Sequence, residues 1–188
     1  MAQYNTYVRV PHETYQQFRN ATLGNGYNVD GFYGNQCWDF CALLWWQYGR
    51  DLRTKLGGGA ACDCWLVSRG YNAQPPFSAV TGKENVKRGD VLVWNRSRIH
   101  SAGHIAIADE DYKSSKNSIS CLGQNQGQGT AAPSNIVDQP WTGFLGIFRN
   151  KYWASSPSPE PEPEEDTSKN KKDFPWPVAW NNWPNFNQ

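Results

Sequence analysis

Hydrophobic residues in the first half of the chain recur with a helical period. In the segment CWDFCALLWWQYG, which begins at Cys37, apolar side chains return every three or four positions, and Gly49 can end the helix. The residues on this face are Cys37, Phe40, Cys41, Leu44, Trp45 and Tyr48. The segment HETYQQFRNATLG predicts a shorter helix that ends near Gly24. We therefore expect a helix with one buried face, whose first residue is a cysteine.

The pattern changes after about residue 85, where short apolar runs typical of strands follow one another. The runs are DVLVW at 90–94, HIAIA at 104–108, SISCLG at 118–123 and FLGIF at 144–148. Turn-rich segments separate them. Because helices come first and strands afterwards, the sequence predicts an α+β domain with an antiparallel sheet.

The end of the chain has a different composition. Residues 154–173 alternate proline with acidic side chains and then turn basic, which is typical of an extended linker. Residues 174–188 set three tryptophans among prolines and asparagines, in a segment too short to fold alone. We predict a domain over 1–153, a linker over 154–173 and a docking segment over 174–188.

Size and charge narrow the class of protein. The 188 residues suffice for one domain with a sizeable core. Residues 1–153 carry fifteen Lys and Arg against eleven Asp and Glu, which suits an anionic partner but lacks the basic stripe of nucleic-acid binders. No apolar run reaches the roughly 18 residues of a membrane span, and the N-terminus lacks the pattern of a signal peptide. We expect no nucleic-acid partner and no membrane span.

The cysteines supply a candidate nucleophile. Five cysteines in no regular spacing imply at least one free thiol. Cys37 opens a helix, where the dipole and unpaired N–H groups favour the thiolate. The alternative is a buried structural cysteine, the commoner role on an apolar helix face. Cys62 and Cys64 are too close together for a usual zinc pair, so we interpret them as packing residues.

A thiolate nucleophile needs a base, and the chain has three histidines. His104 begins the strand-like run HIAIA, and Gly103 before it leaves room for a substrate backbone. His100 lies in a loop segment, and His12 lies in the first helix. His104 is therefore the candidate base, although a lone strand histidine is more often structural.

Amide side chains can complete such a site. The next strand ends in CLGQNQG, which offers Gln124 and Asn125 as the acceptor that fixes the imidazole tautomer. Gln36 directly precedes Cys37, and its side-chain amide is a candidate oxyanion donor beside the backbone N–H of Cys37.

Four motifs in this order, GNQCWDF, RGDVLVW, GHIAIA and GQN, resemble the CHAP family of cysteine, histidine-dependent amidohydrolases/peptidases. The resemblance spans about residues 12–150 and is most like phage-encoded peptidoglycan lysins. It implies a papain-like α+β fold, Cys37 as nucleophile and His104 as base. Many members have an E-x-N arrangement after the histidine strand, whereas this chain has Gly123 in the glutamate place. The resemblance keeps Asn125 as the orienting residue.

A second site is predicted just before the nucleophile. Asn28, Asp30 and the carbonyl of Phe32 alternate, and Asp39 follows half a turn after Cys37. Hard oxygen ligands in this spacing suit Ca²⁺, and some phage lysins of the family bind calcium at matching positions. The alternative is an ordinary polar turn. We expect no required cofactor, with Ca²⁺ as the one candidate ion.

The sequence thus predicts a phage-type hydrolase that cleaves an amide bond of bacterial peptidoglycan. The alternative is a non-catalytic wall-binding or virion structural module that retains the fold. Without a signal peptide, the protein would reach the wall from the host cytoplasm after a membrane lesion or on the virion tail. A tail protein would then be a candidate partner of the Trp-rich segment 174–188.

Overall fold

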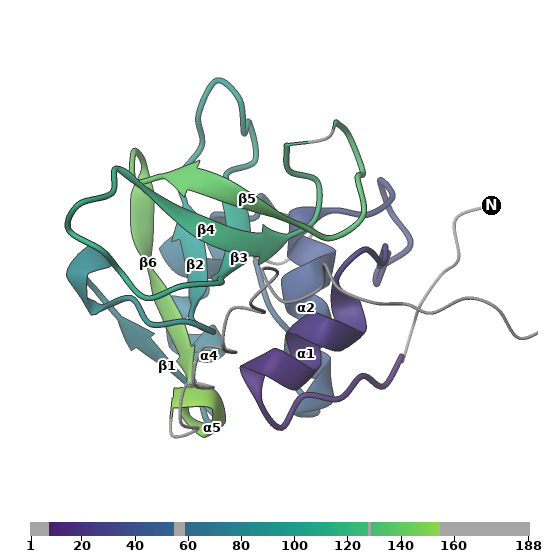
Figure 1. Ribbon diagram of the computed structural model, residues 1–188. Coiled ribbons are helices and arrows are strands. Elements are labelled where there is room, and N and C mark those ends of the chain that lie inside the picture. The colour runs from purple at the N-terminus through teal and green to yellow at the C-terminus, as the bar shows by residue number, and fades with distance from the viewer. Residues whose placement is uncertain (1–7, 55–58, 128, 155–188) are drawn as a thin grey trace, which may run out of the picture. The chain divides into compact units, whose positions relative to one another are not determined.

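Helices precede an antiparallel sheet in the structure, a computed structural model that describes residues 8–54, 59–127 and 129–154 (Figure 1). The helices are α1 (Tyr15–Thr22), α2 (Cys37–Gln47), α3 (Asp63–Leu66), α4 (Arg69–Asn72), the 3-10 turn η1 (Lys83–Asn85) and α5 (Lys151–Ala154). The strands are β1 (Phe77–Val80), β2 (Val91–Trp94), β3 (His104–Ala108), β4 (Ser118–Gly123), β5 (Asn135–Pro140) and β6 (Phe144–Asn150). The predicted α+β class is confirmed.

The sheet has the order β1-β6-β2-β3-β4-β5, with antiparallel neighbours throughout. Its two central strands, β2 and β3, are buried on both faces. Alternate residues enter two different clusters, Val91, Val93, Ile105 and Ile107 on the side of α2 and Leu92, Trp94, Ala106 and Ala108 on the other. The register sets Trp94 opposite His104, at the end of the β2–β3 pair.

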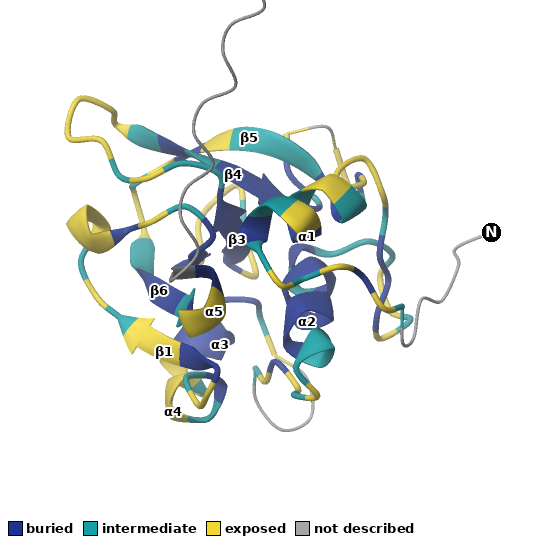
Figure 2. Ribbon diagram, turned by 60° about the horizontal axis from the view of Figure 1, so that its bottom comes forward, coloured by how far each residue is buried: buried dark blue, intermediate teal, exposed yellow. Residues whose placement is uncertain are grey.

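Helix α2 is more deeply buried than its pattern predicted. The sequence indicated one buried face, but every residue from Phe40 to Trp45 is fully buried (Figure 2). The helix packs against β3, and Phe40 also contacts Phe18 of α1, with 5.6 Å between ring centroids. Trp45 stacks on Phe77, the first residue of β1, at 3.8 Å. Neighbours therefore cover the helix on several sides, which fixes the position of its first residue.

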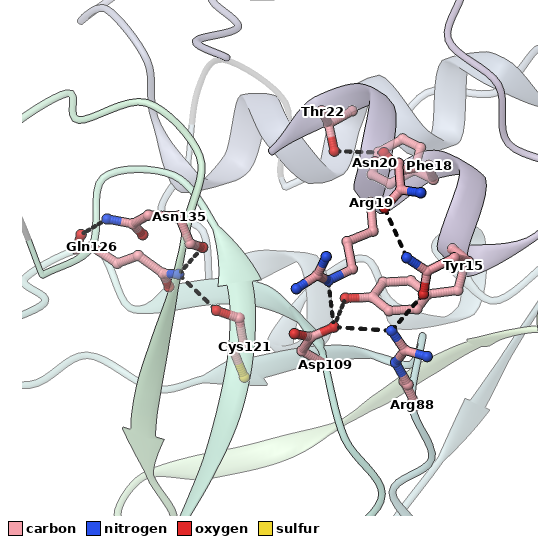
Figure 3. Close-up of polar contacts among 11 residues, drawn as sticks. Tyr15, Phe18, Arg19, Asn20, Thr22, Arg88, Asp109, Cys121, Gln126 and Asn135 are labelled. Atoms are coloured by element: carbon pink, nitrogen blue, oxygen red, sulfur yellow. Dashed lines mark hydrogen bonds and ion pairs between the residues drawn. The ribbon is translucent and has the colours of Figure 1, made fainter. Parts of the chain in front are cut away.

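Helix α1 begins with a capping box and is attached to the sheet by an acidic residue. Gln17 donates its backbone N–H to Thr14 Oγ1, and Thr14 donates to Gln17 Oε1. Asp109, directly after β3, accepts hydrogen bonds from the Tyr15 hydroxyl at 2.8 Å and from Arg19 Nε at 2.9 Å (Figure 3). This cluster ties the helix to the strand that begins with His104.

Two further predictions concern the division of the chain into a domain, a linker and a docking segment, and the absence of a membrane span. Apart from Ala154, the predicted linker (154–173) and docking segment (174–188) lie outside them, so this domain division stays a prediction. Within the described ranges, no helix is both long and apolar enough to cross a bilayer.

Candidate active site

Cys37 is the first residue of α2, and its side chain is buried at 7% exposure. The backbone amide of Ile105, the second residue of β3, is among the groups that hydrogen bond to its thiol. Burial nevertheless raises the pKa of Cys37 to about 11, because removal of water penalises the thiolate more than these bonds stabilise it. The expected preference for the thiolate is therefore wrong for the resting protein, in which the thiol carries its proton.

His104 begins β3, directly before Ile105, and is 1% exposed. His104 directly precedes Ile105, whose backbone amide bonds the Cys37 thiol, so the two residues are close along the chain to the contact between α2 and β3. Gly103 has φ +72°, and a Cβ there would lie 2.6 Å from both Cys62 Cβ and the Trp94 carbonyl oxygen. The glycine thus allows close packing behind the histidine, not the approach of a substrate as the sequence suggested.

Gln126 sets the orientation of the His104 ring. Its Oε1 lies 3.0 Å from His104 Nε2. Its Nε2 donates to the backbone carbonyls of Cys121 at 2.9 Å and Asn135 at 3.0 Å (Figure 3). The amide oxygen must therefore face the ring. An oxygen acceptor at Nε2 requires the proton on that nitrogen. His104 Nδ1 then keeps its lone pair, and among the described residues it is buried without a hydrogen-bond partner.

The environment holds His104 neutral. Burial lowers its pKa to about 4, and the nearby His100 lowers it further, while the bond to Gln126 acts in the opposite direction. The His100 ring lies parallel to the His104 ring, with 4.7 Å between centroids. At neutral pH the Cys37 thiol is therefore protonated and His104 is a neutral imidazole with a free Nδ1, which are the protonation states that proton transfer from sulfur to nitrogen requires.

Asn125 does not occupy the predicted position against His104. Its Nδ2 donates to Gln36 Oε1 at 2.9 Å, and its Oδ1 accepts from the Ala131 N–H at 2.8 Å. The residue has φ +53°, in the left-handed region, and the chain turns there so that Gln126 reaches the imidazole instead. β4 ends at Gly123, so strand alternation could not show which amide of GQNQG would face the ring.

The other two amides of the prediction hold the loop before the nucleophile. Gln36 donates from Nε2 to the Tyr33 carbonyl at 2.7 Å while its Oε1 accepts from Asn125. Gln124 is fully buried, and it accepts from the Tyr27 N–H and donates to the Gln36 carbonyl. These contacts keep Gln36 beside Cys37, which is compatible with the predicted oxyanion role but does not test it.

Asp39, one of the predicted calcium ligands, is held by backbone N–H groups. Asp39 Oδ1 accepts from the backbone N–H groups of Val29 and Asp30, and Oδ2 accepts from that of Gln36. N–H groups therefore occupy the positions from which a metal would bind this carboxylate. Burial raises the pKa of Asp39 to about 6, which still leaves it ionised at neutral pH.

The other two predicted side-chain ligands differ from each other. Asp30 Oδ1 accepts from the Phe32 N–H, which forms a local turn, whereas Asn28 Oδ1 is buried without a hydrogen-bond partner among the described residues. Over the part of the chain that the structure describes, no group of three or more His, Cys, Asp or Glu is placed to hold a metal. The predicted set contains only two such residues, Asp30 and Asp39, so the calcium site stays a prediction.

Helix α2 begins with a buried cysteine, and strand β3, on which it packs, begins with a histidine that Gln126 orients. This combination defines the class of papain-like α+β domains with a Cys–His pair. The model of the CHAP domain matches residues 23–125, more than half of the chain, and this range includes Cys37 and His104. The chain therefore belongs to the CHAP domain family.

Two known proteins resemble the chain. It is 31% identical over 134 residues to the D-alanyl-L-alanine endopeptidase of Streptococcus phage B30, over 69% of this chain and 28% of that protein. The crystal structure of the endolysin LysIME-EF1 superposes with a TM-score of 0.57 at 24% identity, over 74% of this chain and 65% of that chain. The structural likeness shows the shared fold. The chain matches little more than a quarter of the length of the phage B30 protein.

Proposed function

We propose that this chain hydrolyses an amide bond of bacterial peptidoglycan, with Cys37 as nucleophile and His104 as general base. The observation that carries the proposal is the orientation of His104: Gln126 holds the proton on Nε2, so a buried Nδ1 without a partner among the described residues keeps its lone pair to accept a proton. The phage B30 relative is named as an endopeptidase, which supports the same chemistry.

The mechanism follows from these roles. The Cys37 thiol transfers its proton to His104 Nδ1 as the sulfur attacks the amide carbonyl. The backbone N–H of Cys37 and the side chain of Gln36 stabilise the oxyanion. His104 then protonates the leaving amine, and water, activated by the same imidazole, hydrolyses the thioester. Gln126 orients the ring in every step, because its oxygen accepts a hydrogen bond from the Nε2–H group of His104.

Substitution of the nucleophile tests the proposal. Cys37→Ala should abolish clearing of a Gram-positive cell-wall suspension without loss of the folded circular dichroism spectrum. Cys41→Ala is the matched control, since it removes a buried cysteine one turn further along the same helix. Lysis by folded Cys37→Ala protein would refute the nucleophile. A protein that binds walls but releases no fragments would favour the alternative, a non-catalytic wall-binding module.

A second part of the proposal is the identity of the bond that is cleaved. The name of the phage B30 protein makes the D-alanyl–L-alanine linkage the first candidate, and both amidase and endopeptidase products can be distinguished by mass. Mass spectrometry of released muropeptides should show new L-alanine N-termini on the cross-bridge. Free lactyl groups on the glycan would instead indicate an amidase.

We further propose that catalysis needs no calcium, because the Asp39 carboxylate already holds the loop through three N–H donors. Lysis and thermal stability should be unchanged after treatment with a chelator. A loss that Ca²⁺ restores would show a metal requirement.

We retain the docking of segment 174–188 on a virion tail protein as a proposal from the sequence. A chain that ends after Trp153 should keep its activity on isolated walls but lose co-sedimentation with virions. Co-sedimentation equal to that of the full chain would exclude this docking role.

A further inference from the structure

Behind the catalytic imidazole lies a buried cluster of side-chain amides on β5 and the segment after β4. Gln126 and Gln139 are 2% and 6% exposed. Gln139 Nε2 donates to Gln126 Oε1 at 3.0 Å, and the same oxygen faces His104 Nε2 at 3.0 Å. Gln126 Oε1 is therefore the common acceptor of two donors from two different parts of the fold.

The opposite orientation of the Gln126 amide is excluded by the groups around it. If the Gln126 amide were turned over, its oxygen would face the carbonyls of Cys121 and Asn135, and its NH₂ group would face Gln139 Nε2. Those contacts pair acceptor with acceptor and donor with donor in a buried site, where a polar group without a partner is destabilising. The separation of 3.4 Å between Gln139 Nε2 and His104 Nε2 is then the distance between two donors that share one oxygen.

We infer that Gln139 is a positioning residue of the hydrolase: it donates to the same Gln126 oxygen that faces His104 Nε2, and so holds that oxygen and the imidazole in one orientation. The inference rests on the proposed function for its catalytic meaning. Its structural part concerns only the orientation of His104, whose tautomer can be measured without substrate. Gln139 makes no contact with the thiol, so it acts through another residue.

Because residue 123 is a glycine, the Gln126 amide has room to face the His104 ring. A Cβ at position 123 would lie 3.1 Å from Gln126 Oε1 and 3.0 Å from Ala106 Cβ, so the Gln126 carbonyl occupies the space of a side chain there. The sequence placed the glutamate of related chains at this position. In this chain a neutral carboxamide from residue 126 faces the imidazole in place of a carboxylate, and Gln139 supplies the second donor that holds it.

Two variants of the full chain test the inference, with one control. Gln139→Leu removes the donor to Gln126. Gln139→Glu replaces the donor by a carboxylate close to His104. The titratable side chains near that imidazole are His100, which stacks on it, and Cys37, at the N-terminus of the helix packed on β3. Asp138→Asn is the control, because Asp138 is the exposed neighbour of Gln139 on β5.

Long-range ¹H–¹⁵N correlation spectra should show His104 with its proton on Nε2 in the wild type and the control. In Gln139→Leu the Cys121 and Asn135 carbonyls still hold the Gln126 amide, so the proton should stay on Nε2. Because the Gln126 oxygen loses one of its two donors, the ring should be held less firmly, and kcat for wall lysis should fall roughly tenfold with little change in KM. In Gln139→Glu the acidic limit of activity should move up by about one pH unit or more, because a carboxylate stabilises the imidazolium.

A proton on Nδ1 in the wild type would overturn the inference. So would a folded Gln139→Glu variant whose pH limit equals that of the wild type. If Gln139→Leu does not fold, the wild-type spectrum and the Glu variant still decide the question. Lysis by Cys37→Ala protein would refute the proposed function alone, since the tautomer measurement does not depend on activity.

Discussion

The ring of His100 lies parallel to the ring of His104, with 4.7 Å between centroids and 17° between planes. His100 is half-buried in the loop before β3, and its ring covers one face of the His104 imidazole, the proposed base. This contact places a second titratable group against the His104 ring.

The pKa of His104 predicts the acidic limit of activity. Wall lysis should fall as the pH decreases through about 4, because a protonated imidazole cannot accept the Cys37 proton. The folded pKa lies below the ordinary value of 6.5, so the unfolded state takes up the proton first. The stability that depends on this group is complete above pH 6.5 and is lost as the pH falls to 4, by roughly 3 kcal/mol. The free energy of unfolding, measured by urea titration at a series of pH values, should fall more steeply between pH 6.5 and 4 in the wild type than in His104→Gln. The same pH dependence in both proteins would contradict the lowered pKa.

Removal of His100 should move this limit. In His100→Ala water reaches the face of His104, and the repulsion of a second imidazole is lost, so the pKa of His104 should rise toward 6.5. The acidic limit of wall lysis should then move to higher pH. His100→Phe is the control, because it keeps the ring contact and the burial, and its limit should stay close to that of the wild type. Equal limits in His100→Ala and the wild type would remove His100 from the account.

Gly123→Ala should weaken the site without the need for a new backbone conformation. The added methyl would meet Gln126 Oε1 at 3.1 Å and Ala106 Cβ at 3.0 Å, so the amide must move away from His104. We expect kcat to fall at least about tenfold while the free energy of unfolding falls by roughly 1–3 kcal/mol. Gly70→Ala is a suitable control, since a Cβ there meets nothing within 4 Å. Wild-type kcat in Gly123→Ala would show that the Gln126 contact is not needed.

Asp39→Ala should destabilise the loop before the nucleophile. The change leaves the N–H groups of Val29, Asp30 and Gln36 without their acceptor, and Val29 is fully buried. We expect the free energy of unfolding, measured in urea, to decrease by about 3 kcal/mol. Asp30→Ala removes an exposed carboxylate that accepts one N–H, so its loss should stay near about 1 kcal/mol. Similar losses in the two variants would contradict the role of Asp39.

Asp109→Ala should loosen α1. The Tyr15 hydroxyl and Arg19 would lose their common acceptor, and Arg88, at 3.5 Å from the same oxygen, would lose its ion pair (Figure 3). We expect a loss of about 2 kcal/mol in unfolding free energy and faster amide hydrogen exchange in α1 than in β3. Asp111→Ala, which removes an exposed carboxylate nearby, should leave α1 exchange unchanged. Uniform acceleration across the sheet would mean that the cluster stabilises the whole fold and not the helix.

Strands in the centre of the sheet could be predicted, whereas those at its edges could not. β2 and β3 are continuous apolar runs because both of their faces are buried. β1 and β5 are the edge strands of the sheet, and each has only one buried residue, Phe77 and Gln139. Neither strand shows the alternation by which a half-buried strand is recognised. The missed strand β5 is also the one that carries the second amide behind His104.

By itself the sequence determined the α+β class, the CHAP resemblance and the choice of Cys37 and His104, because helix periodicity and the order of motifs are local properties of the chain. Only the tertiary structure decided that Gln126, not Asn125, faces the imidazole and that Asp39 accepts hydrogen bonds from the backbone of the loop before Cys37. Both outcomes depend on where the chain turns after a strand or a helix cap ends, where no periodic pattern remains. The protonated state of Cys37 is likewise a consequence of burial, which opposes the helix dipole and is set by packing between α2 and β3.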